Sequence, residues 1–309
     1  MKSIFAFFRL IRWPNLVFIA LTQFLFWQFI LPFSFAASYT IHESRLLSPL
    51  LFWTIVLASV CIAAAGYIIN DYFDINIDQI NKSDKVIVGI IIKRRAAILL
   101  HAILSLIGFG LSIYVGKEIS NLYVPFFNLV AIAALLVYST TFKKKLLVGN
   151  ILISLLTAWV IVVLSIAEYR LSISVDRIVW QRLLKLTFIY AGFAFIISLV
   201  REVIKDMEDM EGDRKYGCTT MPIVWGIQVS KVFTAVWIVV LTAILAGVQI
   251  YLLQLGWMFS AVYTLFAIII PLVWVLRKLY EAKSSSDFHL LSRTVKLIML
   301  TGILTMVFF

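Results

Sequence analysis

Charged residues and cysteines are scarce in this sequence. Asp, Glu, Lys and Arg make up 14% of the 309 residues, against about 25% in soluble globular domains. With 62% apolar residues, a soluble fold of this length would expose large apolar areas to water. Two cysteines, Cys61 and Cys218, are too few for a disulfide framework or a cysteine-based zinc site. The composition also excludes disorder, a coiled coil and collagen, and leaves a polytopic membrane protein.

Long apolar runs fill most of the chain. We predict nine membrane-spanning helices, because each run is near the ~20 residues that a bilayer requires. We expect one all-α bundle over residues 1–309 rather than two globular domains. The predicted spans are 14–35, 48–70, 96–116, 120–141, 147–168, 182–203, 230–254, 256–277 and 289–309. The first lacks a small-residue cleavage site and begins at a proline, so we expect a retained helix rather than a signal peptide.

Lysine and arginine are divided unevenly between the two ends of these spans. With the spans as assigned, 21 of the 27 lie on the side of the N-terminus and 6 on the other. Such a bias is typical of the cytoplasmic side, and it accounts for the net charge of +11 without a nucleic acid partner. We therefore expect a multi-pass protein of the cell membrane with a cytoplasmic N-terminus and Phe309 on the opposite side. No obligatory protein partner is evident.

Ten of the sixteen acidic residues form two clusters, at the predicted cytoplasmic ends of the second and sixth spans. Each cluster contains three aspartates separated by three and then four residues: Asp71, Asp74 and Asp78, then Asp206, Asp209 and Asp213. On a helix such positions share one face, where stacked carboxylates repel one another. A hard divalent cation relieves that repulsion. The lack of a nearby His/Cys cluster favours Mg²⁺ over zinc, with coordination sites left for substrate phosphate oxygens.

An internal repeat relates the two clusters. The three aspartates of one are offset from those of the other by 135 residues, and the same offset relates Asn15 to Asn150. We therefore predict two parallel four-helix repeats, at about 1–145 and 146–280, followed by an extra helix at about 287–309. Two such repeats would bring both acidic faces around one central cavity. We expect the active site there, on the cytoplasmic side.

Basic residues accompany both clusters. The bias toward cytoplasmic lysine and arginine is the simpler explanation for Lys93, Arg94, Arg95, Lys144 and Lys145. Others are expected to neutralise the charge of a leaving diphosphate beside two Mg²⁺ ions. The second group consists of Lys82, Lys85, Lys143, Arg201, Lys205, Arg214 and Lys215.

The two clusters resemble the paired motifs of the UbiA superfamily of intramembrane prenyltransferases. Residues 70–78, NDYFDINID, are similar to its first Asp-rich motif, and residues 205–213, KDMEDMEGD, to its second. Positions at the start of the first span and between the fourth and fifth spans are also similar: Arg12, Pro14, Asn15, Tyr138, Lys143, Gly149 and Asn150. The resemblance covers the whole chain. It implies nine helices, bound Mg²⁺ and transfer of a prenyl group from an allylic prenyl diphosphate to a lipophilic acceptor.

The resemblance also implies roles for individual positions. Two Mg²⁺ ions would bridge the diphosphate, one held by Asn70, Asp74 and Asp78, the other by Asp209 and Asp213. The expected catalytic residues are Asp71, Asp206, Lys143 and Tyr138. Asp71 and Asp206 would support the metal sites, and either is a candidate base if the acceptor is a hydroxyl. The expected substrate-binding residues are Arg12, Asn15, Lys82, Lys85, Tyr138, Lys143, Asn150, Arg201, Lys205 and Lys215.

The acceptor is the least determined part of this hypothesis. Residues 201–222 most resemble family members that make archaeal-type ether lipids. That resemblance implies transfer of a geranylgeranyl-type chain to a glycerol-phosphate-based precursor such as geranylgeranylglyceryl phosphate. The alternative acceptors are haem and an aromatic quinone precursor of the 4-hydroxybenzoate or dihydroxynaphthoate type. The family's Arg-Pro pair after the first motif is replaced by Lys85-Val86, and lysine lacks the bidentate fork of arginine.

Two classes other than a prenyltransferase were weighed. A cation transporter is a distant alternative, because its charges would lie near the bilayer midplane rather than at the helix ends. A prenyl-lipid binding protein without catalysis would not need a full set of metal ligands.

Overall fold

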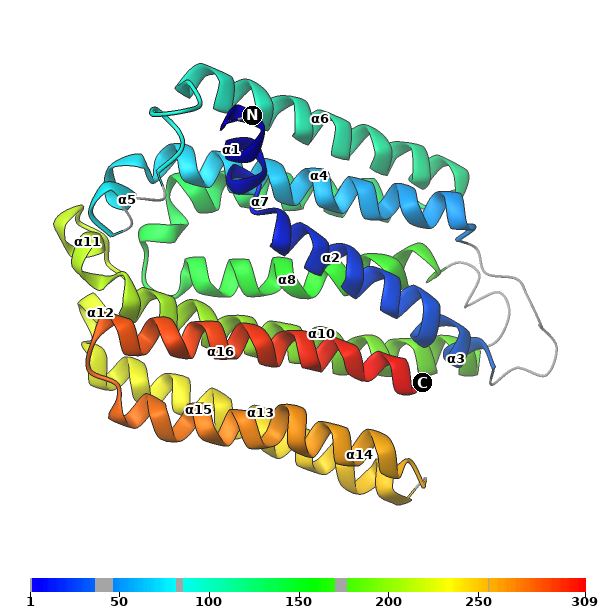
Figure 1. Ribbon diagram of the computed structural model, residues 1–309. Coiled ribbons are helices and arrows are strands. Elements are labelled where there is room, and N and C mark those ends of the chain that lie inside the picture. The colour runs from blue at the N-terminus through cyan, green and yellow to red at the C-terminus, as the bar shows by residue number, and fades with distance from the viewer. Residues whose placement is uncertain (1, 37–46, 82–85, 170–176, 255) are drawn as a thin grey trace. The chain divides into compact units, whose positions relative to one another are not determined.

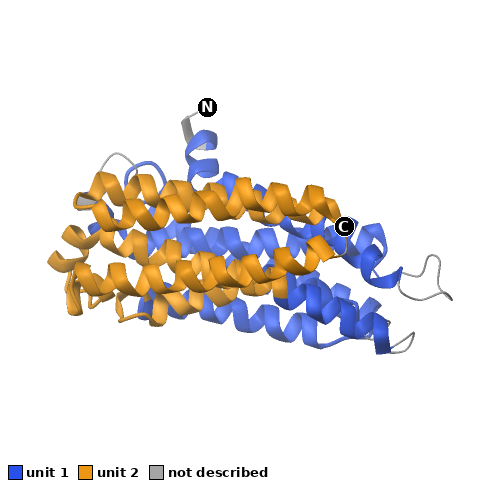
Figure 2. Cartoon of the chain, turned by 90° about the horizontal axis from the view of Figure 1, so that it is seen from below, with its two compact units in different colours: residues 1–142, 159–188 blue, residues 143–158, 189–309 orange. Residues whose placement is uncertain are grey.

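The computed structural model describes residues 2–36, 47–81, 86–169, 177–254 and 256–309 (Figure 1). This part of the chain is helical, and its one pairing of extended residues is an isolated bridge between Val88 and Ile92. The predicted all-α fold class is therefore confirmed. The chain divides into two compact units (Figure 2). Unit 1 consists of Met1–Phe142 and Trp159–Phe188, and unit 2 of Lys143–Ala158 and Ile189–Phe309.

The helices of unit 1 precede the boundary at Phe142. They are α1 (Lys2–Leu10), α2 (Trp13–Leu25), η1 (Phe26–Ile30), α3 (Leu31–Phe35), α4 (Pro49–Phe73), α5 (Ile75–Asn81), α6 (Arg94–Glu118) and α7 (Tyr123–Thr140). At the boundary lies η3 (Phe142–Lys144), and two helices belong partly to each unit: α8 (Val148–Ala167) and α10 (Arg177–Glu208). Unit 2 also contains α11 (Met210–Lys215), α12 (Met221–Val224), α13 (Ile227–Gln254), α14 (Met258–Thr264), η4 (Leu265–Ile269), α15 (Ile270–Glu281), α16 (Ser285–Leu304) and η5 (Thr305–Phe308).

Among the described residues, nine helical segments are long and apolar enough to cross a membrane. They are Trp13–Phe35, Pro49–Phe73, Arg94–Glu118, Tyr123–Thr140, Val148–Ala167, Arg177–Glu208, Ile227–Gln254, Met258–Glu281 and Ser285–Phe308. All nine predicted spans are confirmed to within a few residues. The largest difference is at the sixth span, which extends into the charged second motif.

Two spans contain a π-helical turn, and each turn directly precedes a proline. In the first span, η1 ends two residues before Pro32, and in the eighth, η4 ends two residues before Pro271. A proline has no N–H and its ring clashes with the carbonyl four residues earlier, so a helix with a regular ladder is disrupted there. The backbone shifts to a wider turn, in which the N–H of the residue before each proline bonds the carbonyl five residues back. Both spans therefore continue past their prolines.

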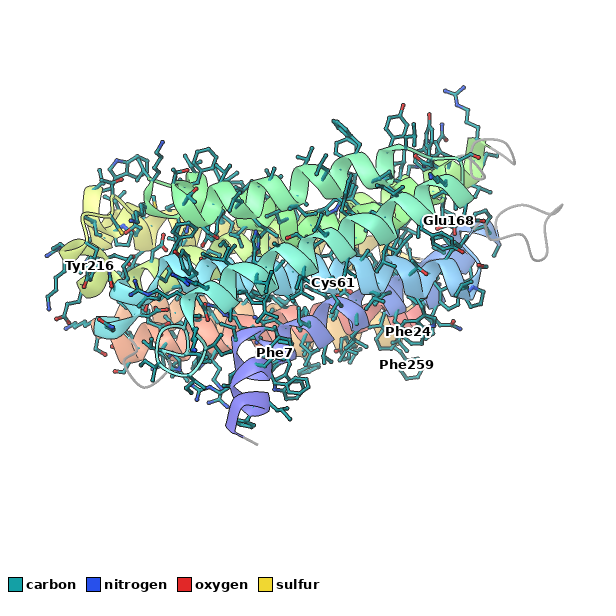
Figure 3. The ribbon with its side chains drawn as sticks, turned by 90° about the horizontal axis from the view of Figure 1, so that it is seen from above. Phe7, Phe24, Cys61, Glu168, Tyr216 and Phe259 are labelled. Atoms are coloured by element: carbon teal, nitrogen blue, oxygen red, sulfur yellow. The ribbon has the colours of Figure 1, made fainter. Side chains whose placement is uncertain are left out.

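In unit 1, α4 packs against α6 and α7. Gly108 of α6 allows this close approach, because a Cβ at this position would lie 3.1 Å from the carbonyl oxygen of Ala58 and 2.7 Å from the side chain of Ile62 on α4. Cys61 is also buried on α4 (Figure 3). The first Asp-rich motif thus follows directly from a helix that is fixed on two sides.

In unit 2, the second half of α10 packs with α13, α15 and α16 around one apolar core. Gly302 of α16 faces Phe193 of α10, and a Cβ at this glycine would overlap the phenyl ring. At its other end α16 begins with a capping box, in which Ser284 and Asp287 satisfy each other's backbone N–H groups. The core and this cap fix α16 against the end of α10 that leads into the second motif.

Candidate active site

The first Asp-rich motif lies where α4 ends and α5 begins. Asp74 interrupts the helix with φ −90° and ψ −1°, and its N–H still donates to the carbonyl of Asn70 at 3.0 Å. The N–H of Asp78 then donates to the carbonyl of Asp74 at 2.8 Å. The motif is therefore not one straight helix, and the predicted single face is bent at its middle aspartate.

An ion pair holds the first aspartate of this motif. Arg12 Nη2 donates to Asp71 Oδ1 at 2.8 Å, and its guanidinium lies 5.1 Å from the centroid of the Tyr67 ring. Burial by itself lowers the pKa of Arg12, although 38% of the side chain stays accessible. The charge of Asp71 and its hydrogen bond with Arg12 outweigh this effect, so the pKa of Arg12 is raised above its ordinary value. Arg12 stands in the left-handed region at φ 49°, between α1 and α2. This residue therefore joins the N-terminal helix to the motif.

The amide of Asn70 bonds to the middle aspartate. Asn70 Nδ2 donates to Asp74 Oδ2 at 2.6 Å, and only 3% of Asp74 is exposed. Asn70 Oδ1 is buried and accepts no hydrogen bond. A buried carbonyl oxygen without a donor is costly, and such groups in folded proteins are ordinarily satisfied by a donor or an ion. The three predicted ligands of one metal ion thus include an unsatisfied oxygen beside a buried carboxylate.

The second motif has the same backbone geometry as the first. Asp209 separates α10 from α11 with φ −93° and ψ 5°, its N–H donates to the carbonyl of Lys205 at 2.9 Å, and the N–H of Asp213 donates to the carbonyl of Asp209 at 3.2 Å. Leu147, which is 135 residues after Arg12, also has a positive φ, at 56°. The internal repeat stays a prediction, and these matching interruptions support it.

Asn150 and Thr219 connect the second motif with the start of α8. Asn150 Nδ2 donates to Asp206 Oδ2 at 2.8 Å. Thr219 donates to the carbonyl of Lys144 twice, from its N–H at 2.8 Å and from its hydroxyl at 2.9 Å. The predicted site residues Asn150 and Asp206 are therefore in direct contact. The loop after the second motif also fixes the backbone beside Lys143.

A buried glutamate lies between the two predicted basic residues of α10. Glu202 accepts from Arg201 Nη1 at 3.0 Å and from Lys205 Nζ at 3.4 Å, and 9% of this residue is exposed. Arg201 Nε is buried and has no hydrogen-bond partner. Glu202 therefore holds both cationic side chains within one helical turn of the second motif. The Nε–H donor of Arg201 has no acceptor among the described residues.

The other predicted residues are distributed over several elements. Asn15 lies in the first turn of α2, and Tyr138 lies near the end of α7 in unit 1, whereas Lys143 belongs to unit 2; all three are partly buried. Lys215 is exposed at the end of α11, 3.7 Å from Glu211, in a surface pair of a kind that contributes little to stability. Lys82 and Lys85 lie outside the described residues.

No group of three or more His, Cys, Asp or Glu side chains that could hold a metal ion occurs within the described ranges. The carboxylates of Asp71 and Asp206 accept hydrogen bonds from Arg12 and Asn150, respectively, and Asp74 accepts one from Asn70. The predicted metal ligands therefore stay a prediction, for which the unsatisfied oxygen of Asn70 is the supporting observation.

The ninth span contributes residues that sequence reasoning missed. His289 Nδ1 lies 2.7 Å from Glu208 Oε1, and the Ser285 hydroxyl donates to the carbonyl of Glu208 at 3.0 Å. Both side chains of α16 therefore contact Glu208, the residue directly before Asp209. The sequence showed His289 as an isolated histidine. No local sequence pattern predicts its contact with Glu208, 81 residues earlier, because the contact depends on how α16 packs against α10.

We expect the His289→Ala substitution to loosen the second motif. Loss of one partly exposed hydrogen bond is worth about 1 kcal/mol, so amide hydrogen exchange in residues 208–215 should become up to about fivefold faster. Hydrogen-exchange mass spectrometry of the membrane-embedded protein measures this rate. Thr294→Ala is the control, since the Thr294 hydroxyl bonds only within its own helix and should leave residues 208–215 unchanged. Equal exchange rates in the two variants would show that His289 does not hold the motif.

The sequence matches a family model described as the UbiA prenyltransferase family over residues 13–299. A curated relative, digeranylgeranylglyceryl phosphate synthase of Methanothermobacter thermautotrophicus, is 36% identical over 221 residues, which are 68% of each chain.

Solved structures show the same fold. One, described as giving insights into digeranylgeranylglyceryl phosphate synthase in membranes, has a TM-score of 0.63 at 22% identity and covers 99% of this chain and 98% of its own. Another, a UbiA homolog from Archaeoglobus fulgidus bound to GPP and Mg²⁺, has a TM-score of 0.55 at 14% identity and covers 98% of this chain and 99% of its own. At these identities the likeness concerns the fold alone.

Proposed function

Since the chain belongs to the UbiA prenyltransferase family, we propose that it moves a geranylgeranyl-type group from its diphosphate to a glycerol-phosphate-based ether-lipid precursor. The chain is an integral multi-pass membrane protein and a prenyltransferase. The family favours prenyl transfer over the distant alternative of a cation transporter. The observation that carries the proposal is the pair of Asp-rich motifs interrupted in the same way at Asp74 and Asp209.

The residues of both motifs fit Mg²⁺. This ion prefers carboxylate and amide oxygens, and Asn70 Oδ1 is a buried amide oxygen without a partner. Asn70, Asp74 and Asp78 would hold one ion, and Asp209 and Asp213 a second. When bound, Mg²⁺ supplies neutralising charge to the diphosphate oxygens and so lowers the barrier to their departure. The solved A. fulgidus homolog was bound to Mg²⁺ together with GPP, which supports the same cofactor here.

Several side chains of the protein would act on the diphosphate directly. Lys143 and Lys205 carry positive charge, which stabilises the charge that develops on the leaving group, and Tyr138 offers a hydroxyl donor. Glu202 keeps Lys205 in place through their contact at 3.4 Å. The apolar spans exclude water from the allylic cation that forms when the carbon–oxygen bond breaks.

Transfer to a hydroxyl acceptor releases a proton, and the hydrogen bonds of the two candidate bases support one of them over the other. The acceptor oxygen bonds to the allylic carbon, the diphosphate leaves with the electron pair of its former bond, and the hydroxyl proton passes to a carboxylate. Asp71 already accepts from the guanidinium of Arg12, whereas Asp206 accepts from the neutral amide of Asn150. A carboxylate paired with a cation is the weaker proton acceptor, so we assign the proton to Asp206.

Among the expected substrate-binding residues Arg12, Lys85, Arg201 and Lys215, the contacts of Arg201 best support a role in binding the acceptor's phosphate. Arg12 is bonded to Asp71, Lys215 is exposed at the surface, and Lys85 lies outside the described residues. Arg201 Nε is buried with no partner, and a phosphate oxygen would satisfy it. The relative that is 36% identical carries the name digeranylgeranylglyceryl phosphate synthase, which supports an acceptor that bears a phosphate.

A panel of acceptors tests this proposal. Membranes containing the protein receive labelled geranylgeranyl diphosphate with geranylgeranylglyceryl phosphate, 4-hydroxybenzoate or a dihydroxynaphthoate. We expect labelled ether lipid with the first acceptor only. Arg201→Gln should raise the KM for that acceptor about tenfold, as expected for loss of a charged hydrogen bond, and change the KM for the prenyl diphosphate less than twofold. Labelling of an aromatic acceptor but of no glycerol-phosphate lipid would refute the proposed acceptor.

The orientation in the membrane is part of the proposal. The excess of basic residues on one side, 21 of 27, places the N-terminus and the site in the cytoplasm and Phe309 outside it. The membrane would be the cell membrane. A reporter fused after Phe309 should lie outside the cytoplasm and one inserted at Lys144 inside, and finding both on one side would refute the orientation.

A further inference from the structure

The N-terminal helix α1 and the turn before α6 expose apolar side chains beside each other in unit 1. On α1, Ile4, Phe5 and Phe8 are 65%, 70% and 48% exposed; in the turn, Ile90 and Ile91 are 69% and 49% exposed. We call these five residues the interfacial patch. The opposite face of α1, through Ala6 and Leu10, is buried in the same apolar core as Ile87 and Val88 of the turn, so one core supports both parts.

The backbone of the turn directs the side chains of Ile90 and Ile91 outward. Gly89 takes a positive φ of 88°, and the N–H groups of Ile90, Ile91 and Ile92 all donate to the carbonyl of Ile87. Ile87 and Val88 point into the core, 5% and 1% exposed. Turn tips in water ordinarily carry Gly, Asn, Asp or Ser. Two adjacent isoleucines at a tip indicate an apolar or interfacial surrounding.

The direction of α1 fits the surface of a bilayer. It crosses the direction of the membrane spans of unit 1 (Figures 1 and 3). Trp13, which is 52% exposed, begins the first span after a gap of two residues from the end of α1. A helix with one apolar outer face that adjoins a span lies in the headgroup region with that face toward the acyl chains. The patch is therefore continuous with surfaces that already face lipid.

The positive charge beside the patch favours anionic lipids. Lys93, Arg94 and Arg95 follow the turn directly, and all three are exposed. Basic residues at the membrane surface attract anionic headgroups. We propose that the interfacial patch inserts into the bilayer surface and that Lys93, Arg94 and Arg95 bind the headgroups of anionic phospholipids there.

This placement connects the membrane surface with the first Asp-rich motif. Leu10 and Ile11 share their core with Ile75 of α5, and Arg12 follows directly and bonds Asp71. A lipid-anchored α1 therefore restrains the segment that positions Arg12.

Spin-label depth measurements test the proposal on the full protein in phosphatidylcholine bilayers, with and without phosphatidylglycerol. Ile90→Cys carries the label, and the unsubstituted protein gives the background from Cys61 and Cys218, which are both buried. We expect the label to be accessible to oxygen but shielded from a water-soluble nickel chelate, and more deeply placed when phosphatidylglycerol is present. Glu211→Cys, on an exposed residue of α11, is the control and should stay open to the chelate.

The combined substitution Lys93→Gln, Arg94→Gln and Arg95→Gln separates the two parts of the proposal. In this background the Ile90 label should remain shielded from the chelate, but its depth should no longer depend on phosphatidylglycerol. A label as open to the chelate as that at Glu211 would overturn insertion. A label closed to both oxygen and the chelate would show that protein covers the patch, and a retained dependence on phosphatidylglycerol would overturn the headgroup contacts.

Discussion

Asp74→Asn and Asp209→Asn are each expected to lower the rate of prenyl transfer by about a thousandfold or more. Both aspartates interrupt a helix at equivalent positions, and each substitution replaces a proposed anionic metal ligand with a neutral group of the same size. The loss corresponds to ~4 kcal/mol in the activation barrier, within the several kcal/mol that a metal ion supplies to a developing charge. Initial rates with labelled prenyl diphosphate measure the effect.

The matched control for these variants is Glu211→Gln. Glu211 belongs to the second motif by sequence, but 82% of its side chain is exposed and its contact is the surface pair with Lys215. Its substitution should change the rate less than twofold, because such pairs contribute little. Activity of Asp74→Asn or Asp209→Asn within tenfold of the unsubstituted protein would contradict the assignment of that residue as a metal ligand.

Arg12→Ala is expected to reduce kcat/KM for the prenyl diphosphate about a hundredfold. The substitution removes the guanidinium that lies 2.8 Å from Asp71 Oδ1 and above the Tyr67 ring. It leaves an uncompensated carboxylate next to the proposed site for the anionic diphosphate. Arg12→Lys should recover only part of the loss, since lysine keeps the charge without the planar donor fork. Arg277→Ala, at an exposed arginine paired with Glu281, should have no measurable effect.

A double-mutant cycle shows whether Arg12 acts through Asp71. If it does, Asp71→Asn should cost less in the Arg12→Ala background than alone, with a coupling energy of about 1–3 kcal/mol. Thermal unfolding of the four proteins shows whether stability changes in parallel. Additive effects of the two substitutions on kcat/KM would contradict this role for Arg12.

The sequence was sufficient to predict the spans. Apolar runs locate helices in a bilayer because backbone groups there must bond within their own segment, so the nine runs predicted the nine membrane-length helices found among the described residues. Arg12, Asp71, Asn150 and Asp206 were named as site residues from the family resemblance, whereas the contacts of Arg12 with Asp71 and of Asn150 with Asp206 come from the structure.

Other features of the structure depend on packing that no local pattern records. The contact of His289 with Glu208 joins residues 81 positions apart, and that of Thr219 with Lys144 joins residues 75 apart. The interruption at Asp74 was also missed, because a spacing of three and four residues is that of one face of a continuous helix and does not record a break within it. Helix α1 lies before the first predicted span and is too short for a hydropathy pattern of membrane length to reveal it.

The most direct test of the central claim is prenyl transfer by the unsubstituted protein with and without its metal. The protein is purified, reconstituted in lipid and treated with EDTA, and labelled geranylgeranyl diphosphate is supplied with geranylgeranylglyceryl phosphate. The account predicts no labelled product after chelation and full recovery of product formation when Mg²⁺ is added in excess. Product formed at an undiminished rate after exhaustive chelation would contradict a mechanism in which the two Asp-rich motifs act through Mg²⁺.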